Sequence, residues 1–144
     1  MNHKKIIWVL LIVSLLILGG IFGIALADYF LPSFHDFLYR IGDGNFVEGK
    51  IHPVFFAFLP LLFITSILFF VRRETFLAWA KFAAPAFPLM LVVLLYTHNN
   101  VPVTGGWIGG PTDDQLATVF LPPLFLIISL LIIGIKSWKL KHSK

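Results

Sequence analysis

The sequence predicts an all-α membrane protein with four transmembrane helices in an up-down bundle. Hydrophobic residues make up 58% of the 144-residue chain and charged residues only 12%, which is more apolar surface than one small soluble core can bury. The apolar residues form four long runs, and the charged residues lie mostly in the gaps between them. We therefore expect residues 1–144 to form a single integral membrane domain.

Four segments are long enough to cross the hydrocarbon core of a bilayer. Residues 6–27, 53–71 and 116–135 contain no charged residue and are 22, 19 and 20 residues long. At a rise of about 1.5 Å per residue, each can span roughly 30 Å. Residues 76–97 form the least clean span, since the ammonium group of Lys81 must reach the headgroups along its flexible side chain.

The first span has an alternative interpretation. A basic start, an apolar stretch and the small residues Ala25 and Ala27 also match a secretory signal peptide. The apolar run is longer than the usual signal core of about 7 to 15 residues, which favours a retained helix. Cleavage would leave three spans in the same orientation.

The distribution of charge predicts the orientation in the membrane. Nine of the 11 Lys and Arg residues lie on the side that holds both termini, and only Arg40 and Lys50 lie on the other. This bias predicts cytoplasmic termini, with residues 28–52 and 98–114 outside, most simply in the plasma membrane. Flanking lysines and arginines, attracted to anionic lipid, also explain the net charge of +4, so we do not expect nucleic-acid binding.

The first outer loop predicts a short amphipathic helix at the membrane interface. Ser33 could cap this helix, and Phe34, Phe37, Leu38 and Ile41 follow at helical spacing. An apolar face of this kind is typical of a helix that lies among the lipid headgroups.

The second outer connection, residues 97–115, reads THNNVPVTGGWIGGPTDDQ. Thr112 and Gln115 have the spacing of a capping box, which predicts that the fourth span begins there. Glycines on both sides of Trp107 favour a flexible turn whose indole ring lies among the headgroups. A re-entrant filter is less well supported, since irregular backbone is tolerated at membrane depth only where protein or water surrounds it.

The middles of the spans carry no Asp, Glu, Lys, Arg or His. The polar side chains expected at depth are the hydroxyls of Ser14, Thr65, Ser66 and Ser129. Ion-coupled transporters normally need ionisable groups near the midplane, so active transport is disfavoured. We expect the hydroxyl groups to hydrogen-bond to their own helix or to a neighbouring one.

Small residues and prolines predict how the spans pack. Gly19, Gly23 and Ala27 recur every four residues and leave one face of the first span nearly bare, which predicts close contact with another helix of this chain or of another subunit. Pro60 in the second span and the Pro122–Pro123 pair in the fourth both lie about two turns below the outer edge, where each predicts a kink.

Three histidines at the outer ends of the spans are candidate metal ligands. His35, His52 and His98 fall on one side of the membrane, where Asp36, Glu48, Asp113 and Asp114 could complete or orient a ligand set. The sequence has no HxxxH or HxH spacing among them, and histidines at a membrane interface are usually solvated or hydrogen-bonded rings, so we expect that the three do not all converge.

The remaining motifs restrict the classes of function. The chain has no cysteine, which excludes thiolate catalysis and thiolate metal sites. It also has no HExxH motif, no nucleophile elbow and no glycine-rich phosphate loop, and nothing in it requires a cofactor. We predict a non-catalytic accessory, scaffolding or assembly subunit of a membrane complex, in contact with the lipid bilayer and with further copies or other subunits. The alternative is a ligand-binding or metal-binding membrane protein, or an enzyme, with its site at the extracytoplasmic ends of the helices.

Overall fold

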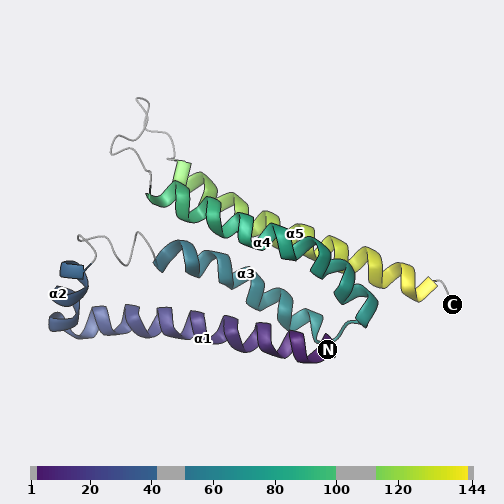
Figure 1. Ribbon diagram of the computed structural model, residues 1–144, viewed down its shortest axis with the longest axis horizontal. Coiled ribbons are helices and arrows are strands. Elements are labelled where there is room, and N and C mark those ends of the chain that lie inside the picture. The colour runs from purple at the N-terminus through teal and green to yellow at the C-terminus, as the bar shows by residue number, and fades with distance from the viewer. Residues whose placement is uncertain (1–2, 42–50, 100–112, 143–144) are drawn as a thin grey trace.

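The computed structural model describes residues 3–41, 51–99 and 113–142, and this part of the chain is helical with no strand. Five helices follow one another within these ranges (Figure 1): α1 (His3–Phe30), α2 (Pro32–Ile41), α3 (His52–Leu68), α4 (Arg73–Asn99) and α5 (Asp113–His142). The predicted all-α class is confirmed.

Three of these helices, α1, α4 and α5, are long and apolar enough to cross a membrane. α3 is also apolar but has only 17 residues, and it ends at Leu68, before the predicted end of the second span at Val71. Large apolar side chains face outward on the long helices; for example, Leu16 is 69% exposed and Phe22 is 62% exposed. Apolar surface on this scale is unfavourable in water and matches a lipid environment, so the fold indicates a membrane protein.

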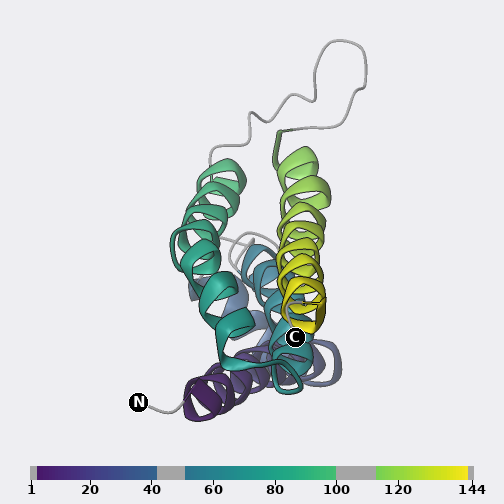
Figure 2. The ribbon, with the colours of Figure 1, turned by 90° about the vertical axis from the view of Figure 1, so that its right-hand side faces the viewer.

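α3 lies at the centre of the arrangement. It packs against α1 on one side and against α4 and α5 on the other, as Figure 1 shows. Figure 2 shows α4 and α5 side by side, and these two helices form the most extensive pairing in the fold. The chain reverses direction between α3 and α4, where the amide of Phe70 donates to the carbonyl of Ile67 at 3.1 Å and closes the end of α3.

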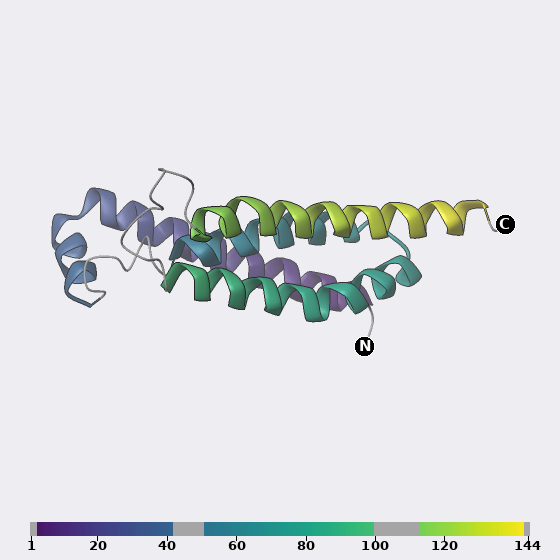
Figure 3. The same ribbon diagram turned by 90° about the horizontal axis from the view of Figure 1, so that it is seen from above.

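Proline residues lie inside α3, α4 and α5 without ending any of them. Each proline removes one backbone donor and crowds the preceding turn, so a bend is the expected result. The ribbon of α4, which contains Pro85 and Pro88, bends visibly in its N-terminal half (Figure 1). α5 continues beyond its apolar run as one helix to His142, as Figure 3 shows.

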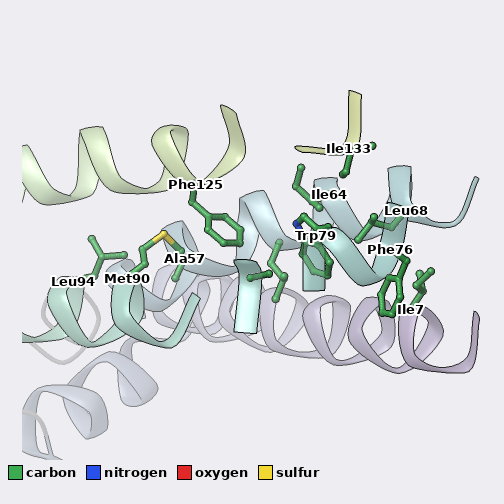
Figure 4. Close-up of a cluster of buried hydrophobic side chains, with 12 residues drawn as sticks. Ile7, Ala57, Ile64, Leu68, Phe76, Trp79, Met90, Leu94, Phe125 and Ile133 are labelled. Atoms are coloured by element: carbon green, nitrogen blue, oxygen red, sulfur yellow. The ribbon is translucent and has the colours of Figure 1, made fainter. Parts of the chain in front are cut away.

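The core lies where α3, α4 and α5 meet, and Ile7 of α1 joins it at one end (Figure 4). Phe125 of α5 stacks on Phe82 of α4, with ring centroids 5.8 Å apart, and also contacts Phe87 at 6.0 Å. Phe87 in turn meets Phe58 of α3 edge to face at 5.2 Å. Aromatic pairs in such geometries contribute about 0.5 to 1.5 kcal/mol beyond the area they bury, and this series of contacts joins all three helices.

α1 and α2 meet at a corner that Pro32 imposes. Proline disfavours helical backbone at the residue before it, and Leu31 accordingly separates the two helices. The Leu31 carbonyl still accepts hydrogen bonds from the amides of Phe34 and His35, at 2.9 and 3.1 Å, so the corner leaves few backbone groups unpaired. The amphipathic helix predicted in this loop is therefore present, but it begins at Pro32, and Ser33 lies in its first turn rather than before it.

Candidate functional site

His35 is engaged at the corner between α1 and α2. Its Nδ1 atom lies 2.9 Å from Oδ1 of Asp28, near the end of α1. The imidazole is 60% exposed, so solvent screens this contact, which contributes little to stability but orients the ring. Asp36, the carboxylate predicted to accompany His35, is exposed on α2 and takes no part in this contact.

The other two candidate histidines lie on different helices. His52 is the first residue of α3, is exposed, and places its ring near that of Phe56, with centroids 6.4 Å apart. His98 is half-buried in the last turn of α4. Within residues 3–41, 51–99 and 113–142, no three His, Cys, Asp or Glu side chains come together as a group that could hold a metal ion. The structure therefore does not bring His35, His52 and His98 together.

Several predicted features fall on residues that the structure does not describe. Glu48, Thr112 and Trp107 lie outside the described ranges, as do the side chains of Asp113 and Asp114. The capping box and the headgroup-anchored turn in the second outer connection therefore remain predictions. α5 begins at Asp113, immediately after Thr112, which is the helix start that the capping box predicts.

Three of the four hydroxyl groups predicted to lie inside the membrane form hydrogen bonds within their own helix, which is one of the two predicted arrangements. Ser14 donates to the Leu10 carbonyl at 2.8 Å, and both Thr65 and Ser66 donate to the Leu62 carbonyl at 2.9 Å. These bonds return each hydroxyl to the preceding turn of its own helix.

Ser129 is the exception, because it joins two helices. Its Oγ atom accepts a hydrogen bond of 3.1 Å from the indole Nε1 of Trp79, between α5 and α4. Trp79 is 2% exposed and Ser129 is fully buried. A tryptophan N–H in an apolar core needs a polar partner, and this serine supplies it.

Gly19 and Gly23 of α1 point away from the other described helices. Ile7, Ser14 and Leu18 are the buried residues of α1 and lie on the side that meets α3. At about 100° of rotation per residue, Gly19 and Gly23 lie about 100° and 140° around the helix from Leu18, away from this side. Ala27, by contrast, is half-buried. A methyl group added at either glycine would meet nothing within 4 Å in the described structure. The predicted contact is thus not made within this part of the chain, and contact with another subunit stays a prediction.

An apolar groove between α3 and α5 was not predicted from the sequence. It encloses about 720 Å³, and Pro60 of α3 and the Pro122–Pro123 pair of α5 line it together. Its polar groups are the hydroxyls of Ser66 and Thr118, near its two ends. The matching depth of the prolines in the two spans was the available sequence signal, since it predicts Pro60 and the Pro122–Pro123 pair at the same level of the bundle.

A second unpredicted feature is a charged recess between α4 and α5. It is an open recess of about 320 Å³, lined by Glu74, Leu77, Ala78, Lys81 and Lys136. The sequence indicated only that Lys81 and Lys136 lie near the same membrane surface, because each is at the edge of an apolar run.

Comparison of the chain with protein-family models, with characterised proteins and with solved structures gave no match. Its function must therefore be inferred from the geometry above.

Proposed function

We propose that the chain is an integral membrane protein with four spans in an up-down bundle, in which α3 crosses the bilayer together with α1, α4 and α5. Residues 69–71 add apolar length to α3, so that Pro53 to Val71 matches the hydrocarbon thickness at about 1.5 Å per residue. The nine-to-two distribution of basic residues supports cytoplasmic termini in a plasma membrane. α2, with an apolar face and an exposed polar face, then lies in the outer interface.

Within the membrane we propose a non-catalytic role as an accessory, scaffolding or assembly subunit. The observation that carries this proposal is that the polar side chains near the middle of the described spans are few and already hydrogen-bonded within the protein. Ser14, Thr65 and Ser66 donate to their own helix, Ser129 accepts from Trp79, and the middles of the spans contain no ionisable side chain. Proton relays, ion binding and acid–base chemistry each need polar groups that are open to a substrate or to water.

The bare face of α1 supports a role in assembly. Helices associate in lipid mainly through close van der Waals packing, which small residues permit. Gly19 and Gly23 are exposed, and the described part of the chain leaves the space beside them open. Another subunit, or a second copy of this chain, is the partner that such a face accepts.

A second candidate function is the binding of an apolar ligand, and the groove between α3 and α5 is the observation that favours it. Its volume of about 720 Å³ is within the usual range of roughly 300 to 1,000 Å³ for small-molecule sites. The Ser66 hydroxyl donates to Leu62 but can still accept a hydrogen bond, and with Thr118 it would orient a ligand that carries a polar group.

Gentle native purification separates the two candidates. The complex should be extracted in a mild detergent and examined by mass spectrometry for proteins and small molecules. A protein partner in fixed stoichiometry supports the subunit role. A stoichiometric apolar molecule on an otherwise solitary chain, lost in a Pro122→Leu variant that fills the groove, supports the second candidate and contradicts the first.

A further inference from the structure

The recess between α4 and α5 combines apolar walls with two cations. Leu77 and Ala78 form its apolar part, and the charged side chains around it are Glu74, Lys81 and Lys136. Lys81 is exposed and Lys136 is half-buried. Two ammonium groups and one carboxylate leave the recess with a net charge of +1.

The fold holds the two lysines on adjacent helices. Thr75 of α4 and Ser137 of α5 place their hydroxyl oxygens 3.5 Å apart, and these residues are the sequence neighbours of Glu74 and Lys136. This contact lies at the edge of the recess, where α4 packs against α5, so the backbones that carry the two lysines are held next to each other.

No hydrogen bond or ion pair within the described ranges joins Lys81 or Lys136 to Glu74 or to any other side chain. Like charges on neighbouring helices repel, and a bound anion would relieve this repulsion. Lys136 directly follows the apolar run of α5, and Lys81 lies near the start of that of α4. This depth is that of the lipid headgroups in the topology proposed above.

We propose that this recess binds the headgroup phosphate of an anionic phospholipid. The two lysines hold the phosphate, and the Glu74 carboxylate accepts hydrogen bonds from headgroup hydroxyls. Basic recesses between transmembrane helices on the cytoplasmic side are suited to such headgroups. A separate apolar recess of about 230 Å³ on the same two helices, lined by residues that include Phe82, Leu89 and Leu124, offers surface for acyl chains. The proposal requires that α4 and α5 cross a bilayer, and it is independent of the subunit role.

The test is a lipid titration of the purified full chain in phosphatidylcholine–detergent micelles, followed by native mass spectrometry. Phosphatidylglycerol is the probe. The Lys81→Ala, Lys136→Ala double variant is compared with Lys139→Ala, Lys141→Ala, which removes two exposed lysines of α5 that do not line the recess. We expect the first variant to bind at least about tenfold more weakly than the parent, because with each lysine of the recess a charge-assisted hydrogen bond to the phosphate is lost, and one such bond is worth about tenfold or more in affinity. The control loses only general surface attraction, so its loss should be clearly smaller. If the alanine variant does not fold, Lys81→Gln with Lys136→Gln gives the same comparison with similar side-chain length.

Three results would overturn the proposal. Equal losses in the two double variants would show general surface attraction rather than a site. Displacement of the lipid by millimolar inorganic phosphate would show that the recess recognises a free anion. Stronger binding of phosphatidylethanolamine than of phosphatidylglycerol, lost in Glu74→Gln, would show a site for a zwitterionic headgroup. Each of these leaves the subunit proposal standing, because none of them measures assembly.

Discussion

Breaking the hydrogen bond between Trp79 and Ser129 should weaken the packing of α4 against α5. In Ser129→Ala the indole N–H loses its acceptor in a site where Trp79 is only 2% exposed. An unsatisfied buried donor costs about 1 to 3 kcal/mol, whereas hydrogen bonds between transmembrane helices average about 0.6 kcal/mol and reach about 1.7. Because water cannot reach the buried indole N–H and replace the serine as acceptor, we expect a loss of about 1 to 2 kcal/mol in the free energy of unfolding.

A double-mutant cycle measures this contact more cleanly than either substitution alone. Trp79→Phe removes the donor but also reduces the volume of the core, so its own effect mixes two causes. The coupling energy between Trp79→Phe and Ser129→Ala subtracts the volume term and should be about 0.6 to 1.7 kcal/mol. Reversible unfolding in mixed micelles, followed by the tertiary signal of the remaining tryptophans, is the assay.

Ser66→Ala is the matched control for this cycle. Ser66 is exposed and donates only to the Leu62 carbonyl of its own helix, which its removal leaves bonded within the helix. We expect its effect to stay below about 0.5 kcal/mol. A coupling energy near zero for Trp79 and Ser129, or an effect of Ser66→Ala as large as that of Ser129→Ala, would refute the view that this bond joins the two helices.

Two further predictions concern topology and the α1–α2 corner. In intact cells an impermeant thiol reagent should label Tyr39→Cys but not Lys141→Cys; labelling of Lys141→Cys alone would reverse the orientation. Pro32→Ala restores a backbone donor and removes the restriction on Leu31, so α1 and α2 should merge into a longer helix. Spin labels at positions 22 and 39 should then move apart, and an unchanged distance would show that packing rather than proline sets the corner.

The helices could be predicted from the sequence because a lipid bilayer requires long apolar segments whose backbone hydrogen bonds are made within the segment. Apolar runs flanked by charge fix the existence and the approximate positions of α1, α3, α4 and α5. Their ends were less predictable: α5 extends through Lys136 to His142 because no proline or glycine interrupts it there. Local hydrogen bonding was also predictable, since a hydroxyl such as Ser14 can reach the preceding turn of its own helix whatever the fold.

Contacts between helices could not be predicted in the same way. The glycine stripe of α1 is visible in the sequence, but the face that α1 turns toward α3 carries Ile7, Ser14 and Leu18 instead. Burial in a membrane gives no polarity contrast between a helix face that meets lipid and one that meets apolar protein. The positions of His35, His52 and His98 likewise depend on how the helix ends are arranged, and spacing along the chain did not reveal this.

The most direct test of the proposed subunit role is the stoichiometry of the natively extracted complex in Gly23→Leu and Gly134→Leu variants. Both glycines are exposed, and neither has a described atom within 4 Å of an added methyl group, but only Gly23 belongs to the bare face of α1. We expect the parent and Gly134→Leu to retain a partner subunit or a second copy in fixed ratio, and Gly23→Leu to lose it while remaining folded. A partner retained equally in both variants, or a parent chain that is solitary in every mild detergent, would contradict the proposed role.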